Sequence, residues 1–332
     1  MIYESTSENI KEAVDLLKSG EVIAIPTETV YGLAADANNP KAVAKIFQIK
    51  GRPSFNPLIS HYAELGEIKK DVEFNEKARI LAEKFWPGPM TLVLNKTSNS
   101  RISDIVSANL KTAAVRIPNH KTTLELLNKF SGPLAAPSAN PSGKLSPSKA
   151  IHVQELFQSK LNFILDGGSC KHGLESTVID LSEDQVKVLR YGSIKLEEIE
   201  SVVQDIVLPP ESEKGIKAPG MMLKHYSPKT HLEINLRIEE ILHKQDKNKN
   251  IALILFGRKD LNQEIIQKLN QQYHKIINLS EVGDHKEAAK NLFSSLHELD
   301  KLNLDKILIQ EIPSLGIGLA INDRLRRAAK TS

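Results

Sequence analysis

Residues 21–36 read "EVIAIPTETVYGLAAD", a stretch that joins an apolar run to a polar turn that a simple core strand does not need. The run "EVIAI" predicts a buried strand. The turn after it carries two threonines, the carboxylate of Glu28 and the phenol of Tyr31, which are costly to bury without hydrogen-bond partners. Two interpretations stay open: a plain turn in which Pro26 and Gly32 supply the backbone geometry, or one wall of a binding site.

Composition describes an ordinary globular protein. The 332 residues suffice for about two domains with cores of their own. Hydrophobic residues make up 40% of the chain and charged residues 26%, which is usual for this class. Lys and Arg number 44 against 41 Asp and Glu, an excess of 44 − 41 = 3. So small an excess gives no sign of a nucleic-acid-binding coat, although it permits a local basic site.

The single cysteine, Cys170, excludes an internal disulfide and a cysteine zinc cluster, so a reducing compartment fits the sequence. The first residues, "MIYESTSENIKEAVDLL", carry acidic charge early and no long apolar core, which is unlike a secretion signal. No stretch approaches the roughly 20 apolar residues of a membrane span. We therefore expect a soluble, cytoplasmic protein without a membrane partner.

The first part of the chain alternates helical and extended patterns. In "SENIKEAVDLLKSG", the residues Ile10, Val14 and Leu17 share one helical face, and Gly20 follows as a stop signal. "NNPKAVAKIFQIKG" has an asparagine N-cap, a proline at the first helical position and a closing glycine. Further strands are expected at "MTLVLN", "AAVRIP", "NFILDGG", "STVIDL" and "VKVLRYG", and their close succession near the end favours a mixed sheet.

The character of the sequence changes at residues 208–230, where Pro, Lys and Ser are frequent and periodicity is lost. We interpret this stretch as a linker between a first domain of residues 1–207 and a second domain of residues 231–332. In the second domain, helical and strand patterns alternate from "RIEEILHK" and "NIALILF" to "DKILIQEI" and "NDRLRRAAK". This alternation predicts a small, doubly wound, Rossmann-like parallel sheet, so both domains belong to the α/β class.

Polar clusters in the first domain have the residue types of a functional site. Lys50, Arg52, Asn56 and His61 fall in "KGRPSFNPLISH", at and after the end of a helix. The two cations also suit a solvated helix end, which the helix dipole favours, and a lone histidine is commonly a satisfied side chain. Arg116 lies mid-strand in "AVRIP", preceded by Thr112, and there it either faces solvent or holds an anion.

A second set of polar residues follows the apolar run "GPLAA". The loop "APSANPSGKLSPS" contains Ser138, Asn140 and Ser146, while "GLESTVIDL" and "VLRYGS" add Ser176 and Arg190. Small residues and prolines of this kind are consistent with turn chemistry alone. A loop at the end of a strand is also the place where α/β proteins carry ligands, so a site at this loop is the alternative.

These clusters supply cations, hydroxyls and amides without the pattern of a catalytic nucleophile. No serine has a G-x-S-x-G context, the phosphate-loop pattern G-x-x-x-x-G-K-[ST] is absent, and "GIGLAI" fails the dinucleotide fingerprint. No carboxylate cluster has the spacing of metal ligands. A basic site of this kind suits phosphoryl or nucleotidyl transfer through positioning and charge neutralisation.

An ordered set of strings connects these clusters to a known family. "PTETVYGL", "KGRP" with "NPL", "WPGPMTLVL", "VRIP", "APSANPSG" and "ESTVID" occur in this order between about Ile10 and Ser193. Together they resemble the YrdC-like domain of threonylcarbamoyl-AMP synthases, which implies a twisted mixed sheet. "PGMMLKHYSP" followed by a small α/β domain is similar to the longer, two-domain form of that family. The one departure noted is Ala34, where many relatives have glycine.

The resemblance implies a reaction in which L-threonine, bicarbonate and ATP give threonylcarbamoyl-adenylate and pyrophosphate. The substrate supplies the nucleophile, because a carbamate oxygen attacks the α-phosphate. Mg²⁺ would arrive with ATP, and no tightly bound organic cofactor is implied. A separate tRNA threonylcarbamoyl transferase would receive the product and modify the adenosine next to the anticodon, so that tRNA is not needed for this step.

The resemblance also implies roles for individual residues. The catalytic set around the ATP phosphates comprises Lys50, Arg52, Ser138 and Asn140. The implied ATP contacts are Arg52, Asn56, Thr112, Ser138, Ser146, Arg190 and Tyr226. The implied threonine contacts are Thr29, His61, Arg116, Ala136 and Ser176. Among them, Arg116 is suited to hold a carboxylate with two parallel hydrogen bonds.

Other interpretations stay open. One alternative is a module of the same fold that binds RNA and catalyses no reaction, but the chain lacks the regularly spaced stacking aromatics of RNA-binding motifs. Carbamoyl-transfer maturation enzymes contain the same fold, but they carry cysteine zinc motifs. A paralogue with altered activity would not need the intact motifs. Within the linker, Tyr226 is expected either to contact ATP as part of a lid or only to attach the linker to a domain surface.

Overall fold

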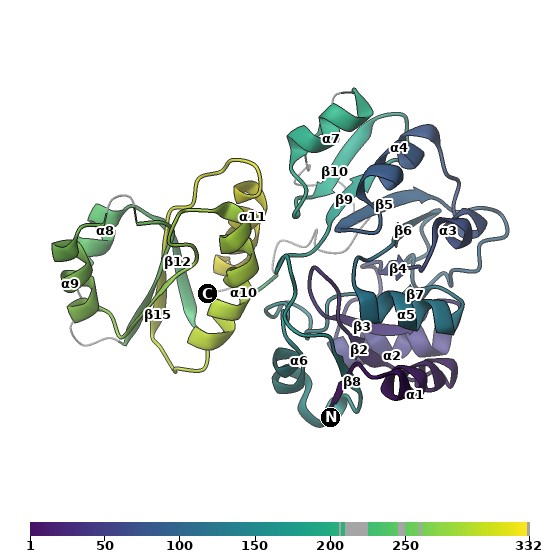
Figure 1. Cartoon of the computed structure of the whole chain (residues 1–332), viewed down its shortest axis with the longest axis horizontal. Coiled ribbons are helices and arrows are strands. Elements are labelled where there is room, and N and C mark those ends of the chain that lie inside the picture. The colour runs from purple at the N-terminus through teal and green to yellow at the C-terminus, as the bar shows by residue number, and fades with distance from the viewer. Residues whose placement is uncertain (206, 210–224, 245–249, 259–260, 331–332) are drawn as a thin grey trace. The chain divides into compact units, whose positions relative to one another are not determined.

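The structure is a computed structural model (Figure 1) that describes residues 1–205, 207–209, 225–244, 250–258 and 261–330. Its contacts divide the chain into two compact units, residues 1–142 with 146–222 and residues 143–145 with 223–332. The division falls inside the predicted linker of residues 208–230, most of which lies outside the described residues. The domain limits expected from the sequence therefore stay a prediction.

The first unit alternates strands and helices. Its strands are β1 (Ile2–Glu4), β2 (Ile23–Ile25), β3 (Gly32–Asp36), β4 (Ile59–His61), β5 (Met90–Asn95), β6 (Thr112–Arg116), β7 (Leu134–Ala135), β8 (Ile164–Asp166), β9 (Thr177–Asp180), β10 (Val186–Arg190) and β11 (Val207–Leu208). Its helices are α1 (Ser7–Lys18), α2 (Pro40–Lys50), α3 (Leu65–Asp71), α4 (Glu76–Phe85), α5 (Lys121–Phe130), α6 (Ala150–Phe157) and α7 (Leu196–Val203), with a 3-10 turn at Gln158–Lys160.

The described strands of the first unit form one sheet in the order β1-β8-β2-β3-β7-β4-β6-β5-β9-β10-β11. β2 and β3 pair antiparallel, as do β5 and β6, whereas β4 runs parallel to β6 and β5 runs parallel to β9. The sheet is therefore mixed, which confirms the expectation from closely spaced strands. The apolar runs "MTLVLN" and "AAVRIP" are β5 and β6, which lie side by side in the sheet.

The ends of α2 follow the signals in the sequence. Asn39 caps the helix, and its side chain accepts the backbone N–H of Lys41 at 3.0 Å. Pro40 takes the first helical position, and Gly51 closes the helix with a φ of 59°. This left-handed conformation costs glycine little, so the chain reverses directly after Lys50. The predicted caps are confirmed. Lys50, the last residue of α2, is placed where the polar loops begin.

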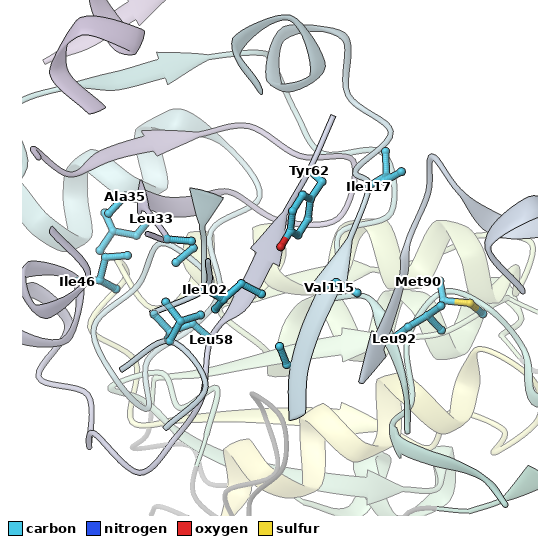
Figure 2. Packing of buried hydrophobic residues seen from close by; sticks show 14 of the residues in the cluster. Leu33, Ala35, Ile46, Leu58, Tyr62, Met90, Leu92, Ile102, Val115 and Ile117 are labelled. Atoms are coloured by element: carbon cyan, nitrogen blue, oxygen red, sulfur yellow. The ribbon is translucent and has the colours of Figure 1, made fainter. Parts of the chain in front are cut away.

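Side chains alternate between the two faces of the sheet, and this alternation separates the main core from a second, smaller apolar cluster. Leu92 of β5 and Val115 of β6 face the main core, to which Ile46 of α2 also belongs (Figure 2). Helix α4 contributes Ala78 and Leu81 to the same core. The opposite face carries a separate cluster formed by Ile59, Val93, Ala114 and Val178. Arg116 is two residues after Ala114, so alternation places it on the face of this small cluster.

A further core lies where α1 and α5 pack on β2 and β3. Ile10, Val14 and Leu17, which are predicted to share a helical face, are all buried there. Ala34 of β3 belongs to the same core and is fully buried. The departure from glycine at this position therefore adds a methyl group to a hydrophobic core.

The second unit has a sheet of its own. Its strands are β12 (His231–Leu236), β13 (Ile251–Leu255), β14 (Lys275–Asn278) and β15 (Lys306–Gln310), and its helices are α8 (Ile238–His243), α9 (Gln263–Gln272), α10 (His285–Leu299) and α11 (Gly318–Ala329). The described strands are all parallel, in the order β12-β15-β13-β14. Helices α8 and α9 cover one face and α10 and α11 the other (Figure 1), which confirms the doubly wound sheet.

The sequence does not predict β12, and its geometry explains why. The pairing of β12 with β15 shifts register between Glu233 and Leu236, and Asn235 has a positive φ of 59°. Such a bulge interrupts the alternation of buried and exposed residues by which a strand is found in a sequence.

Within the described part of the chain, no helix is both long enough and apolar enough to cross a membrane. The longest described helix, α10, has 15 residues and carries charged side chains along its length. A span needs about 20 predominantly apolar residues.

Gly192 follows β10 and lies directly on the backbone that leads into β9. A Cβ atom added there would stand 2.2 Å from the backbone nitrogen of Thr177 and 2.5 Å from the carbonyl carbon of Ser176. Backbone atoms cannot give way as a flexible side chain can. We therefore predict that Gly192→Ala lowers the free energy of unfolding by about 3 kcal/mol, as measured by denaturant unfolding followed by circular dichroism.

The matched control is Gly66→Ala in α3, where the nearest non-neighbouring atom to the added Cβ is Oε1 of Glu64 at 3.8 Å. Alanine favours a helix over glycine, so this variant is expected to equal the wild-type stability or to exceed it by up to about 1 kcal/mol. Equal unfolding midpoints for the Gly192→Ala and Gly66→Ala variants would show that the backbone at residues 175–177 is not held against Gly192.

Candidate active site

The turn after β2 is organised by Thr27. Its Oγ1 accepts the backbone N–H groups of Thr29 and Val30, both at 3.2 Å, and donates to the carbonyl oxygen of Val30 at 2.6 Å. Oγ1 of Thr29 lies 2.8 Å from Oγ1 of Thr27. Hydroxyls close turns in this way by replacing backbone hydrogen bonds. The first threonine of the turn therefore serves backbone geometry, and the next two residues are presented to β6.

Arg116, the last residue of β6, meets this turn with its guanidinium group. Nη2 lies 2.6 Å from Oε1 of Glu28, and Nη1 donates to Oγ1 of Thr29 at 3.1 Å. Nε donates to the carbonyl oxygen of Gly88 at 3.1 Å. Only 4% of the Arg116 side chain and 3% of the Glu28 side chain are exposed. Of the two alternatives for Arg116, a place on the solvent face is therefore wrong, and the residue holds an anion within the protein.

Burial and charge oppose each other in this group. Burial raises the pKa of Glu28, but the adjacent Arg116 and the backbone N–H of Asn119 outweigh it, so that the pKa lies below its ordinary value. His61 is paired with Arg116 in the β4–β6 register, and burial followed by the charge of Arg116 lowers the pKa of His61 to about 3. At neutral pH, Glu28 is therefore charged and His61 is neutral. The group carries one positive and one negative charge.

The remaining residues of the turn connect it to other strands. The hydroxyl of Tyr31 lies 3.0 Å from Oδ1 of Asp166 and 2.8 Å from the carbonyl oxygen of Gly168, beyond β8. Gly32 begins β3, where an added Cβ would stand 3.2 Å from the Cβ of Ala136. Glycine therefore lets β3 approach residues 136–138 closely. The four polar side chains of this turn, Thr27, Glu28, Thr29 and Tyr31, each contact another side chain, which favours a built site over a plain turn.

Lys50 holds the second loop of the site. Its Nζ donates to the backbone carbonyl oxygens of Ser138 and Asn140, both at 2.5 Å. Its own carbonyl oxygen accepts the backbone N–H of Ser142 at 2.7 Å. The loop that carries Ser138 and Asn140 is thus attached at three points to the end of α2. Since only 3% of Lys50 is exposed, a solvated helix end is wrong for this residue.

Arg52 is also buried and supports its own loop. Nη2 donates to Oδ1 of Asn56 at 2.6 Å and to the carbonyl oxygen of Pro57 at 2.9 Å, while Nε donates to the carbonyl oxygen of Asn56 at 3.1 Å. Burial, followed by the positive charge of Arg52, holds the pKa of Lys50 well below its ordinary value, and Glu175 acts in the opposite direction. Two cations that destabilise each other are stabilised by a bound anion, so this pair is suited to phosphate.

Glu175 is a site residue that the sequence analysis does not single out. Its Oε1 accepts a short hydrogen bond from Oγ of Ser146, and both side chains are buried. The only signal in the sequence is its position directly before Ser176 in "GLESTVIDL". The contact that reveals it joins residues 29 positions apart, and no local pattern encodes it.

Ser176 links the two sides expected from the sequence. Its Oγ lies 2.7 Å from Oγ1 of Thr91, a residue that the sequence analysis misses. The same Oγ accepts from Nη2 of Arg190 at 3.1 Å, and Nε of Arg190 donates to the carbonyl oxygen of Ser176 at 3.1 Å. The resemblance assigns Ser176 to threonine and Arg190 to ATP, and the structure places these two side chains in direct contact.

Two expected residues lie outside these contacts. Thr112 begins β6, is half-buried, and lies on the same face as Arg116 by alternation. Tyr226 is part of the second unit, where its ring centroid lies 5.6 Å from that of Phe293 and 5.4 Å from Cζ of Arg324. Its expected contact with ATP stays a prediction.

The chemistry available to this site is positioning and charge. Within the described ranges, no group of three or more His, Cys, Asp or Glu side chains is placed to hold a metal ion. Cys170 is buried, and burial raises the pKa of its thiol far above the ordinary value, so it is not an activated nucleophile. Cations, hydroxyls and backbone groups in fixed positions are what the described residues offer to a substrate.

Comparison with known families covers nearly the whole chain. A family profile described as "Telomere recombination" matches residues 15–192, and one described as "Threonylcarbamoyl-AMP synthase, C-terminal domain" matches residues 194–330. The second description agrees with the family that the sequence motifs resemble.

Individual relatives give the same result. The chain is 39% identical to the threonylcarbamoyl-AMP synthase of Pyrococcus abyssi, over 96% of this chain and 94% of that protein. It is 38% identical to the protein of the same name from Bacillus subtilis, over 96% of this chain and 92% of that protein. A crystal structure of the P. abyssi homologue complexed with L-threonine aligns with a TM-score of 0.88 at 36% identity, covering 99% of this chain and 97% of that chain. The chain therefore belongs to the threonylcarbamoyl-AMP synthase family, in its long form with two domains.

Proposed function

We propose that this chain makes threonylcarbamoyl-adenylate and pyrophosphate from L-threonine, bicarbonate and ATP with the residues described above. The observation that carries the proposal is the division of the buried polar residues into two groups of different charge. One group contains the ion pair of Arg116 and Glu28, and the other contains the two neighbouring cations Lys50 and Arg52. A zwitterionic amino acid suits the first group, and a triphosphate suits the second.

At the amino-acid end, Arg116 binds the α-carboxylate of threonine. A guanidinium group has five N–H groups, and the contacts to Glu28, Thr29 and Gly88 engage one nitrogen each. N–H groups on Nη1 and Nη2 are therefore available for two parallel hydrogen bonds to a carboxylate. The other residues proposed for this end are Thr29, His61, Ala136 and Ser176.

At the phosphate end, Lys50 and Arg52 neutralise the charge of the triphosphate. Lys50 also fixes the loop of Ser138 and Asn140, so the same residue places the cation and the loop. The further ATP contacts proposed are Asn56, Thr112, Ser146, Arg190 and Tyr226. The apolar cluster of β4, β5, β6 and β9 lies on the same sheet face as Arg116 and is buried.

The reaction takes two steps. The threonine nitrogen bonds to the carbon of bicarbonate, water leaves, and a carbamate forms. A carbamate oxygen then attacks the α-phosphorus of ATP while the bond to pyrophosphate breaks on the opposite side. The substrate is the nucleophile, so the protein needs only to hold two reactants together and to neutralise their charge.

Mg²⁺ is proposed to enter with the triphosphate. Among the described residues of the phosphate end, Glu175 is the single carboxylate, which is fewer than a dedicated site uses, so the phosphates would supply most of the ligands. The product is a hydrolysable mixed anhydride. We therefore expect a separate tRNA threonylcarbamoyl transferase to consume it, and no tRNA to be needed for its formation.

The reaction is tested by isotope exchange between pyrophosphate and ATP with purified protein and Mg²⁺. Exchange is expected only when threonine and bicarbonate are both present, and it is expected without tRNA. A protein that binds RNA but supports no exchange would be a binding module of this fold. Exchange that continues without bicarbonate would exclude the carbamate route.

Variants of the two arginines test the division of the site. Arg116→Ala is expected to raise KM for threonine about tenfold to a hundredfold with a smaller effect on ATP, because a charge-assisted pair is lost at the amino-acid end. Arg52→Ala is expected to raise KM for ATP by a similar factor. Steady-state pyrophosphate release with one substrate varied at a time gives both constants.

The control for a lost arginine is Arg79→Ala on α4, where the guanidinium is exposed and pairs with Glu76 and Glu83. This variant should leave both KM values unchanged, since exposed pairs contribute little. Thermal unfolding of each variant shows whether the fold is kept. Equal effects of the two site variants on both substrates would mean that the two ends are assigned wrongly.

A lid over the nucleotide is proposed for the segment that contains Tyr226. Within the second unit, Ser227 donates its backbone N–H to the carbonyl oxygen of Gly143 at 2.7 Å. This hydrogen bond joins two segments of the second unit that are distant in the sequence. The burial of Tyr226 within the second unit supports the alternative, in which the tyrosine only anchors the segment.

Two substitutions separate a lid from an anchor. Tyr226→Phe keeps the buried ring and removes the hydroxyl, so a direct contact with ATP predicts a KM for ATP raised by up to about tenfold. An anchor predicts wild-type kinetics for Tyr226→Phe and a loss of stability for Tyr226→Ala. Wild-type KM values in the Phe variant would therefore remove the ATP contact from the proposal.

A further inference from the structure

Glu28 is a buried carboxylate to which the proposed reaction gives no task. Only 3% of its side chain is exposed, and the backbone N–H of Asn119, which lies outside normal hydrogen-bond geometry, helps to lower its pKa. Its close contact is the ion pair with Nη2 of Arg116 at 2.6 Å. A carboxylate has about four acceptor positions, so Glu28 can accept a hydrogen bond from a ligand in addition to these contacts.

We propose that Glu28 binds the α-ammonium group of the amino-acid substrate, so that Glu28 and Arg116 together form a receptor for a zwitterion. The inference rests on the proposed function in taking these residues as the amino-acid end, and it adds the group of the substrate that Glu28 binds. In an α-amino acid, the ammonium and carboxylate groups are attached to the same carbon atom. Two adjacent side chains of opposite charge match that arrangement.

The charge of the group supports this assignment. Arg116 alone would give a positive site, which suits any small carboxylate. With Glu28 ionised and His61 neutral, the group has no net charge, and a neutral zwitterion enters it without leaving an unpaired charge. The contacts of Arg116 to Gly88 and Thr29 fix the guanidinium independently of Glu28, so the substrate carboxylate need not displace the glutamate.

The buried position of Glu28 strengthens the expected effect. An ammonium group that binds beside Glu28 loses its hydrating water. Its charge-assisted hydrogen bond to the carboxylate is then stronger than it would be in water. A substrate without the ammonium group leaves the glutamate without that partner. The pair therefore selects for amino acids and against hydroxy acids of the same shape.

The same carboxylate acts on the product of the first step. When the C–N bond forms, one proton of the amine leaves in the water that bicarbonate releases and another goes to the solvent. A cationic ammonium group thereby becomes an anionic carbamate. Glu28 attracts the first and repels the second, whereas Lys50 and Arg52 attract the carbamate. Glu28 therefore favours movement of the new carbamate towards the phosphate end.

The test compares two ligands that differ only in the amine. L-Threonine and 3-hydroxybutanoate share the carboxylate and the hydroxyl, and calorimetric titration measures their affinities without ATP or bicarbonate. For Glu28→Gln we expect the affinity for threonine to fall about tenfold to a hundredfold, whereas the affinity for 3-hydroxybutanoate stays unchanged or rises. Wild-type protein should bind threonine more tightly than 3-hydroxybutanoate.

Other outcomes overturn the inference. If Glu28 only holds Arg116 in place, Glu28→Gln weakens both ligands by the same factor. If Glu28 competes with the substrate carboxylate for Arg116, both ligands bind more tightly to the variant. Equal affinity of the wild-type protein for the two ligands also excludes ammonium recognition, and this result does not depend on any variant folding.

Two further variants complete the experiment. Glu125→Gln on α5 removes a half-buried carboxylate that is paired with Lys129 away from the site, and it should change neither affinity. Glu28→Asp keeps the charge with a shorter side chain and should retain a preference for threonine over 3-hydroxybutanoate. If the wild-type protein supports threonine-dependent exchange but Glu28→Gln loses affinity for both ligands equally, only the inference is contradicted. If the wild-type protein supports no exchange, the proposed function is contradicted.

Discussion

The site depends on the buried ion pair between Arg116 and Glu28. Taking two such charges out of water costs several kcal/mol for each, and the cost is offset only when other groups hold the pair in good geometry. Here Gly88 and Thr29 hold the arginine, and the turn that Thr27 closes holds the glutamate. Removal of one partner would leave an unpaired buried charge at a cost of about 3–5 kcal/mol. The turn, β6 and the residues before β5 are therefore restricted to one arrangement.

Strand register brings the remaining side chains to this pair. The parallel pairing of β4 and β6 sets His61 opposite Arg116. The parallel pairing of β5 and β9 sets Thr91 opposite Val178, two residues after Ser176, so that Thr91 and Ser176 share a face and their hydroxyls meet. A shift of one residue in either pairing would turn these side chains to the other face of the sheet. The main core on that other face opposes such a shift, because it would have to accept the polar groups.

Periodicity and capping residues predict elements, whereas pairing between distant residues decides the site. The ends of α2 follow from Asn39 and Gly51, because these signals act within one turn of helix. The contact of Ser146 with Glu175 depends on how two loops meet. The contact of Thr91 with Ser176, 85 residues further along the chain, depends on strand register. Glu28 stands out in the sequence as costly to bury, but its partner Arg116 is found only when β6 is in place.

With the proposed roles, the two ends of the site share a hydrogen bond. Arg190 is assigned to ATP and donates to the hydroxyl of Ser176, which is assigned to threonine and also contacts Thr91. A hydroxyl has one proton and two lone pairs, so a ligand that engages Ser176 changes what Arg190 can bind. Coupling of this kind is reciprocal, because a change in free energy at one site must equal the change at the other. If the coupling is positive, ATP binds more tightly once the amino acid is in place, which suits a reaction whose first product is an unstable carbamate.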